Sequence, residues 1–252
     1  MTLDHGGGKA YLWAVPPPNL DSSTAPLPDI FSRWFARRGW SPRAHQLALL
    51  AKARADRSAL LIAPTGAGKT LAGFLPTLVE LGGASPKTRT SGLHTLYISP
   101  LKALAVDIAR NLETPVAEMG LPIRIETRTG DTPASRRQRQ RRYPPDIMLT
   151  TPEQLALLLA SDDAPYLFAS LKRVVLDELH ALVTSKRGDL LSLGLSRLWT
   201  VAPQVRAIGL SATVAEPESL ARFLVPQSTS PPSEKRRGGV GGGGLFNEDS
   251  AG

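Results

Sequence analysis

Short apolar runs alternate with longer segments of helical periodicity along most of the chain. Six mainly aliphatic and β-branched runs of four or five residues lie at positions 59–63, 95–99, 123–126, 146–150, 173–177 and 207–210. Segments with helical spacing of apolar residues lie at 70–81, 104–118, 152–159, 190–201 and 216–224. Apolar strands separated by helices are typical of a parallel sheet covered by helices on both faces. The pattern therefore predicts an α/β domain.

The two ends of the chain differ from this pattern. Residues 1–29 contain Gly6-Gly7-Gly8 and Pro16-Pro17-Pro18, which oppose regular structure, so they are predicted to form a flexible arm that could hold one short strand. The ordered domain is predicted to cover 30–226. Residues 227–252 are rich in Gly, Ser, Pro and Arg and cannot build a core, which predicts a disordered tail. Such a tail could tether nucleic acid, or it could result from truncation or a change of reading frame.

The composition excludes several classes of protein. The 252 residues are 42% hydrophobic and 21% charged, which is enough to bury one large core. The absence of cysteine excludes disulfides and cysteine-ligated zinc, and four histidines argue against a histidine-rich metal site. No apolar run approaches the roughly 18 residues of a membrane span, and the start does not resemble a signal peptide. We therefore expect a soluble, cytoplasmic protein with no membrane contact.

The net charge of +8 comes largely from one arginine-rich segment. Its members are Arg136, Arg137, Arg139, Arg141 and Arg142. Such a concentration of positive charge favours a polyanionic partner, such as nucleic acid. A solvated helix face or loop is the other interpretation of this segment.

A phosphate-binding loop is predicted at positions 63–70, Ala-Pro-Thr-Gly-Ala-Gly-Lys-Thr, where an apolar run passes into a helix. Glycines let backbone N–H groups surround phosphates, and the helix N-terminus adds the positive end of its dipole. Lys69 is expected to reach the β- and γ-phosphates of ATP, and the Thr70 hydroxyl to ligate Mg²⁺. Ala63 stands where the general pattern has its first glycine. The expected nucleotide-binding residues are Thr65, Gly66, Ala67, Gly68, Lys69 and Thr70.

A pair of carboxylates, Asp177 and Glu178, follows the apolar run at 173–176. A parallel sheet would bring this pair to the same carboxyl edge as the phosphate-binding loop. Asp177 is then expected to hold the Mg²⁺ shell, and Glu178 to orient and deprotonate the attacking water. With Lys69, these two residues are the catalytic candidates. Local capping of a strand end is the alternative role for such a pair.

The motifs resemble a known family when they are taken together. The loop at 63–70, the sequence Asp-Glu-Leu-His at 177–180 and Ser-Ala-Thr at 211–213 resemble, in order and spacing, the first RecA-like domain of a superfamily 2 DExH-box helicase, a P-loop NTPase fold. The segments 100–104 and 128–132 are similar to the Lhr-type group. The opening Trp-Ser-Pro-Arg-x-His-Gln, at 40–46, is similar to its bacterial ligase-associated DNA helicase branch. The resemblance covers residues 30–226.

The resemblance implies roles for further residues. Gln46 would read the adenine of ATP, and His180 would link the ATP site to the Ser-Ala-Thr motif of Ser211 and Thr213. The implied contacts with a nucleic-acid backbone are Lys102, Arg128, Thr129 and Thr151. Thr151 also suits the N-cap of a helix, with proline at the first helical position and a glutamine at 154 closing a capping box.

The resemblance implies an ATP-driven DNA helicase or translocase of 3′-to-5′ polarity, acting in DNA repair beside proteins such as a ligase; RNA is open as a substrate. Family motors carry a second RecA-like domain whose arginines reach the γ-phosphate, and Arg/Gly-rich sequence stands where that domain would begin. Residues 1–252 alone are therefore expected to bind Mg-ATP with little turnover. The alternatives are a non-catalytic fragment that binds nucleotide and nucleic acid, and the first domain of another P-loop repair or restriction translocase.

Overall fold

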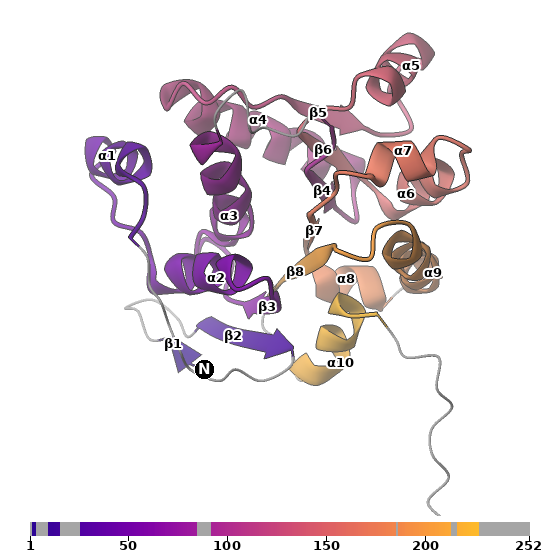
Figure 1. The fold of residues 1–252 in the computed structure, drawn as a ribbon. Helices are drawn as coiled ribbons and strands as arrows, with labels where there is room; N and C mark the ends of the chain where they lie inside the picture. Colours follow the sequence, from indigo (N-terminus) through magenta and orange to yellow (C-terminus); the bar gives the residue numbers. More distant parts are fainter. Residues whose placement is uncertain are drawn as a thin grey trace, which may run out of the picture.

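One twisted sheet forms the centre of the domain (Figure 1). The computed structural model describes residues 2–3, 10–15, 26–84, 92–184, 186–212 and 216–226. The strand order is β1-β2-β3-β8-β7-β4-β6-β5. The six parallel strands are β3 (Ser58–Ile62), β4 (Thr95–Ile98), β5 (Ile125–Arg128), β6 (Ile147–Thr150), β7 (Arg173–Leu176) and β8 (Arg206–Ser211). The predicted α/β class with a parallel sheet is confirmed.

Two antiparallel strands extend the sheet beyond β3. Strand β1 (Thr2–Leu3) pairs with β2 (Ala10–Val15), and β2 pairs with β3 from Tyr11 opposite Ile62 to Val15 opposite Ser58. Both lie in the segment predicted to be an arm with at most one short strand. The run Ala-Tyr-Leu-Trp-Ala-Val has strand-forming content that the flanking glycine and proline runs obscured. The rest of residues 1–25 and the tail 227–252 lie outside the described residues, so their disorder stays a prediction.

Successive residues of each strand point to opposite faces of the sheet, and helices cover both faces. Leu61 and Tyr97 pack on the face covered by α1 (Asp29–Arg37), α2 (Ala44–Arg54), α3 (Lys69–Gly83) and α4 (Lys102–Glu118). Leu60 and Leu96 pack on the other face. That face is covered by α6 (Pro152–Leu159), α7 (Ala164–Phe168), α8 (Leu179–Val183), α9 (Lys186–Val201), α10 (Pro217–Ala221) and the 3₁₀ helix η1 (Arg222–Leu224). Burial of apolar area on both faces drives this three-layer arrangement.

One strand begins later than predicted. The apolar pattern placed a strand at 123–126, but β5 covers Ile125–Arg128. The backbone N–H of Arg124 donates to the carboxylate of Asp146 at 2.7 Å, so pairing with β6 starts one residue further on, at Ile125 opposite Ile147. Hydrophobicity alone does not reveal this side-chain contact. The pattern also does not predict the helices α1, α7 and α8.

Helix α5 (Ala134–Arg142) stands at the outer edge of the sheet, next to β5 (Figure 1). The Gln140 side chain, which is fully buried, donates to Glu126 Oε2 at 2.9 Å and to the Thr127 carbonyl at 3.0 Å. Arg136 and Arg139 form ion pairs with the same Glu126. The arginine-rich segment is thus a helix held on β5 by polar contacts.

A cluster of charged side chains fastens α3 to the edge of the sheet where the parallel strands begin. The Glu80 carboxylate lies 3.3 Å from His94 Nε2, 2.8 Å from Lys172 Nζ and 3.2 Å from Arg173 Nη1. These partners, with the His94 contact contributing most, hold the pKa of Glu80 well below its ordinary value, although partial burial opposes the shift. The carboxylate therefore stabilises the fold in its charged form.

Replacing Glu80 with Gln is expected to lower the free energy of unfolding at pH 7 by about 1 kcal/mol. The loss is this small because the Glu80 side chain is partly exposed and solvent screens its ion pairs. The folded-state pKa lies below the unfolded value of about 4.3, so the wild-type chain loses this contribution as pH falls through about 4 towards the folded pKa. The variant has no such charge to lose. Urea unfolding of the wild type and the variant, at pH 7 and at about pH 3, measures the stability difference between them. A difference that is equal at the two pH values would contradict the assignment.

Within the described ranges, every helix is too short or too polar to cross a membrane.

Candidate nucleotide and nucleic-acid site

The phosphate-binding loop connects the end of β3 to the start of α3. Gly66 and Gly68 have φ angles of 80° and 74°, in the left-handed region that glycine adopts without strain. Gly68 is the N-cap of α3, so the first free N–H groups of this helix open into the loop. A Cβ atom at Gly68 would lie 3.1 Å from Gln46 Nε2. The loop is therefore shaped for an anion at a helix N-terminus, and it fits the phosphates of ATP.

Lys69 occupies the first position of α3 and is buried. Its ammonium donates to the carbonyls of Ala63 at 2.8 Å and Pro64 at 3.2 Å, and so bridges the two ends of the loop. Both acceptors are neutral. A phosphate oxygen is a stronger, charged acceptor for the same ammonium.

Helix α2 supports the loop from the other side through its first turn. Gln46 is buried; its Oε1 accepts the Arg43 N–H at 2.9 Å and its Nε2 donates to the Gly68 carbonyl at 3.4 Å. Arg43 Nη1 donates to the Gly66 carbonyl at 3.3 Å. Gln46 thus lies at the loop, and its implied role in reading adenine stays a prediction. Arg43 was not among the predicted site residues; its N-cap position on the same helix is the signal that could have found it.

Asp177 follows β7 at the same carboxyl edge of the sheet and is buried. Its Oδ2 accepts a short hydrogen bond from the Tyr97 hydroxyl, and its Oδ1 accepts the Glu178 N–H at 2.9 Å. Burial, with the nearby Asp177 charge, raises the pKa of Tyr97 far above its ordinary value. The Tyr97 phenol therefore stays protonated, and by donating this hydrogen bond it holds the Asp177 carboxylate in place. Sequence reasoning missed this positioning residue.

The donor set fits Mg²⁺. Thr70 lies in the first turn of α3 and Asp177 at the end of β7, two strands away. Within the described residues, no group of three or more His, Asp or Glu could form a metal cage. Mg²⁺ beside nucleotide needs no such cage, because it takes one or two protein oxygens and completes its shell with phosphates and water.

Glu178 has an unusual backbone conformation, with φ 47° and ψ 46°. Among the described residues, Asp56 is the other non-glycine residue with positive φ. This conformation costs about 1 to 3 kcal/mol for such a side chain, and residues that adopt it cluster at functional sites. Glu178 is the N-cap of α8 and lies between β7 and that helix. Its Oε2 lies 3.5 Å from His180 Nδ1.

His180 links α8 to the end of β8. Its Nδ1 lies 3.0 Å from Ser211 Oγ and accepts the Ala212 N–H at 3.4 Å. The structure thus brings His180 and Ser211 together beside Glu178. Thr213, the third predicted coupling residue, lies outside the described residues.

The remaining candidates gather at the carboxyl ends of β4, β6 and β5. Lys102 begins α4 after β4, and its Nζ lies 2.7 Å from Asp131 Oδ2 in an exposed ion pair. Arg128 ends β5 and Thr129 follows it, and Thr151 follows β6. The Thr150 hydroxyl, donating to the Arg128 carbonyl at 2.8 Å, ties the two strand ends together.

These three candidates differ from Lys102 in exposure. Arg128, Thr129 and Thr151 are 4%, 6% and 7% exposed. Arg128 Nη1 donates to the Arg137 carbonyl at 3.1 Å, and burial, followed by the charges of Arg141 and Arg137, lowers its pKa to about 10. Arg128 therefore also holds α5 against β5, a structural role that the motif did not indicate.

Thr151 is the N-cap of α6 and Pro152 its first residue, as the sequence predicts. The predicted capping box is wrong, because no side-chain cap hydrogen bond forms there and Gln154 is buried. Instead the neighbouring Glu153 pairs with Arg187 at 2.9 Å. Arg187 Nη1 also donates to the Pro100 carbonyl at 2.7 Å, so α9 ties together the segments after β4 and β6. Sequence reasoning did not identify Arg187.

The strand order divides the carboxyl edge of the sheet into two halves. The nucleotide half consists of the ends of β3, β8 and β7, which carry the loop, Ser211 and Asp177. The outer half consists of the ends of β4, β6 and β5, which carry Lys102, Thr151 and Arg128. Strands β7 and β4 are neighbours, so the halves adjoin.

A phosphate-binding loop and a carboxylate-bearing strand end at one edge of a parallel sheet define a P-loop NTPase of RecA-like fold. The sequence matches the DEAD/DEAH box helicase family over residues 43–220, so the chain belongs to this family. It is similar to the Lhr helicase/probable uracil glycosylase of Mycolicibacterium smegmatis, with 43% identity over 80% of this chain and 14% of the relative. It is also 40% identical to the ATP-dependent helicase Lhr-Core of Methanocaldococcus jannaschii, over 76% of this chain and 24% of the relative.

Solved structures agree with this assignment. The structure of the Mycobacterium smegmatis helicase Lhr bound to ssDNA and AMP-PNP has a TM-score of 0.71 and 41% identity, over 79% of this chain and 26% of that chain. The DUF1998 helicase MrfA bound to DNA and AMPPNP has a TM-score of 0.68 and 26% identity, over 85% and 30%. The chain spans 14% and 24% of the length of the two relatives, and 26% and 30% of the two solved chains.

Proposed function

We propose that this domain binds Mg-ATP at the nucleotide half and the backbone of a nucleic-acid strand at the outer half, as the first RecA-like domain of an ATP-driven helicase or translocase. The observation that carries the proposal is the division of one sheet edge into two adjoining halves, each holding one set of candidates. The relative bound to ssDNA and AMP-PNP supports the same pair of ligands.

Each residue of the nucleotide half has a proposed role. The loop N–H groups from Thr65 to Gly68 would hold the phosphates, and Lys69 would exchange its two carbonyl acceptors for phosphate oxygens. Thr70 and Asp177 would hold Mg²⁺, with Tyr97 fixing the carboxylate. Mg²⁺ supplies charge neutralisation of the phosphates. Glu178 would accept a proton from the attacking water.

The contact between His180 and Ser211 supports a coupling role. His180 lies between Glu178, at 3.5 Å, and the segment that follows β8. A shift at Glu178 would therefore reach Ser211 through a single imidazole. Thr213 would extend this route.

The polymer is proposed to be DNA, because the two solved relatives described above, Lhr and MrfA, are bound to DNA. Backbone contacts of the kind inferred here also admit RNA. The 3′-to-5′ polarity and the ligase-associated repair role rest on the resemblance alone, and the cytoplasmic location stays an expectation from the sequence. An alternative is a domain that binds nucleotide and nucleic acid but does not hydrolyse ATP.

Replacing Lys102 with Ala is expected to weaken binding of single-stranded DNA several-fold and to lower the slope of log K against log salt by about 0.7, the contribution of one phosphate contact. Lys102 qualifies because it is exposed and begins α4 at the outer half. Fluorescence anisotropy at several salt concentrations measures both quantities. Arg33→Ala, which removes the same charge from an exposed position of α1, is the matched control. An unchanged slope for Lys102→Ala would place the strand elsewhere.

A further inference from the structure

A hollow at the amino-terminal edge of the sheet, opposite the carboxyl edge that holds the two halves described above, combines exposed aromatic rings with arginines. Its volume is about 360 Å³, and its lining includes Arg124, Arg142, Tyr143 and Tyr166. Tyr143 and Tyr166 are 57% and 64% exposed, which is unusual for rings of this size. We call this feature the tyrosine hollow.

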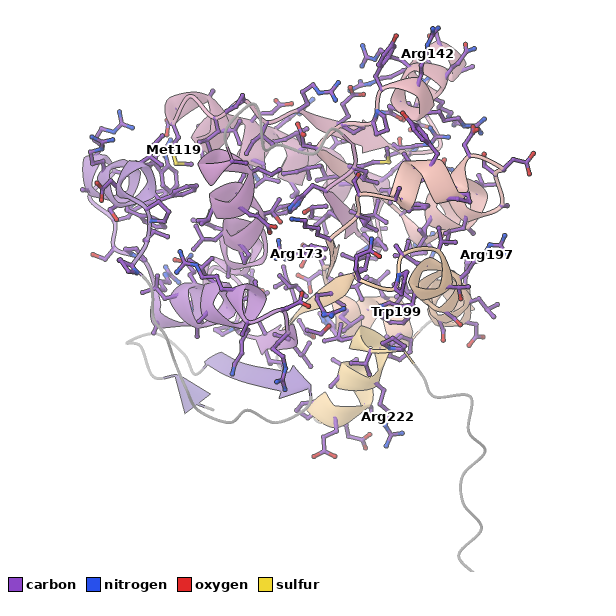
Figure 2. All side chains as sticks on the ribbon, viewed as in Figure 1. Met119, Arg142, Arg173, Arg197, Trp199 and Arg222 are labelled. Atoms are coloured by element: carbon purple, nitrogen blue, oxygen red, sulfur yellow. The ribbon has the colours of Figure 1, made fainter. Side chains whose placement is uncertain are left out.

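The position of the tyrosine hollow follows from the topology. Arg124 immediately precedes β5, and Tyr143 and Pro144 lie between α5 and β6. Tyr166 comes from α7, which leads back towards β7. The hollow therefore lies at the amino-terminal edge of the strands, whereas the outer half lies at the carboxyl edge. Helix α5 runs between the two edges, and Arg142 lies on its outer end (Figures 1 and 2).

The arginines of α5 divide into two groups by their contacts. Arg136 and Arg139 are held by Glu126, and Arg137 donates to the carbonyls of Gly130 and Thr132. These contacts hold α5 in place.

The last two arginines of α5 have looser contacts. Arg141 is exposed and lies 3.6 Å from the exposed Asp163. The guanidinium of Arg142 lies 5.6 Å from the centre of the Tyr143 ring, within range of a cation–π contact. Both side chains are exposed, and Arg142 lines the tyrosine hollow.

We propose that the tyrosine hollow is a second binding site for single-stranded nucleic acid, beyond the outer half. The inference rests on the nucleic-acid binding proposed above and extends it to the far edge of the sheet. Exposed aromatic rings stack unpaired bases, and neighbouring guanidinium groups contact phosphates and ring faces. A duplex keeps its bases stacked inside, so this chemistry favours a single strand. Tyr143 and Tyr166 stack bases, and Arg141 and Arg142 contact the backbone.

The dimensions allow one strand to reach both sites. The nine residues of α5 span about 13 Å, at 1.5 Å per residue. A stacked single strand covers this distance with about four nucleotides at 3.4 Å each. A short oligonucleotide occupies the outer half alone, whereas a longer one continues along α5 to the tyrosine hollow.

The test compares short and long oligonucleotides. Tyr143→Ala and Tyr166→Ala, together, are expected to weaken binding of an oligothymidylate of about 20 nucleotides by roughly 5- to 100-fold, the loss typical of a stacked base, and to leave one of about six nucleotides unchanged. Tyr143→Phe with Tyr166→Phe keeps the rings and should keep the affinity. Leu193→Ala, at an exposed apolar residue of α9, is the control for lost surface area. Oligouridylates of the same lengths form a second arm.

The outcomes separate this inference from the proposed function. If the Ala pair has the affinity of the Leu193→Ala control for the long oligonucleotide, the tyrosine hollow is not a binding site. If Lys102→Ala leaves both lengths unchanged while the Ala pair weakens the long one, the outer half has been misassigned and the hollow stands. If a photocrosslinking oligonucleotide modifies neither tyrosine in the wild-type chain, mapped by mass spectrometry, the inference is overturned even where affinity falls.

Discussion

Replacing Glu178 with Gln is expected to lower ATP hydrolysis about 10²- to 10⁴-fold while leaving ATP affinity within a few-fold, because the amide cannot take a proton from water. The side chain follows Asp177 and lies 3.5 Å from His180, in the strained turn at the nucleotide half. A change of this size in turnover, with affinity retained, is the signature of a general base.

The assay needs measurable turnover. Residues 1–252 alone are expected to hydrolyse ATP slowly, since an arginine supplied across such a site is worth roughly 10³ to 10⁵ in rate in related P-loop enzymes. Steady-state hydrolysis is therefore measured with DNA on a polypeptide in which a second RecA-like domain follows this one. Asp189→Asn, on α9, is the matched carboxylate control. Retained hydrolysis in Glu178→Gln would assign the base to another group.

Replacing Lys69 with Ala is expected to weaken ATP binding at least about 100-fold, because removing one partner of a buried, charged hydrogen-bonded pair costs several kcal/mol. Lys69 is buried at the start of α3, with its ammonium inside the phosphate-binding loop. Titration with a fluorescent ATP analogue measures the affinity.

Lys69 also bridges the carbonyls of Ala63 and Pro64, so its loss could loosen the loop itself. Thermal unfolding of the variant separates the two effects, since a folded chain with an unchanged midpoint isolates the loss of phosphate contact. Lys52→Ala, which removes the same charge from a different helix, α2, should bind the analogue as the wild type does. Unchanged affinity in a folded Lys69→Ala chain would remove the nucleotide assignment.

The sequence could predict the sites that depend on strand ends, because a parallel sheet aligns all its carboxyl ends at one edge. The loop from Ala63 to Thr70 and the pair Asp177 and Glu178 follow apolar runs directly, so their meeting follows from topology. Tyr97 could not be found in this way. Its hydroxyl reaches Asp177 across 80 positions of sequence, from the middle of a strand that reads as core.

Burial explains the other differences between prediction and structure. Motif resemblance gives Lys102 and Arg128 the same role, but Lys102 is exposed and Arg128 is covered by α5. No local pattern distinguishes the two. The arm was expected to hold one short strand but forms two, β1 and β2, because pairing with a neighbouring strand adds to local propensity in deciding whether a short segment forms a strand.

The arginine-rich segment shows how contacts resolve an ambiguous composition. From sequence it suited both a solvated face and a polyanion site. In the structure, Arg136, Arg137 and Arg139 hold α5 on β5, whereas Arg141 and Arg142 are exposed and Arg142 lines the tyrosine hollow. The structure therefore shows a helix anchored by three of these arginines, and contact of the exposed Arg142 with nucleic acid stays a proposal.

The division of the sheet edge into a nucleotide half and an outer half is tested most directly by measuring both ligands on the same two variants. ATP-analogue binding is measured without DNA, and single-stranded DNA binding without nucleotide, for the wild type, Lys69→Ala and Lys102→Ala. The predicted result is a crossed loss: Lys69→Ala loses the analogue and keeps DNA, while Lys102→Ala weakens DNA and keeps the analogue. A folded variant that loses both ligands together would show that the two halves are one site, and would contradict the account.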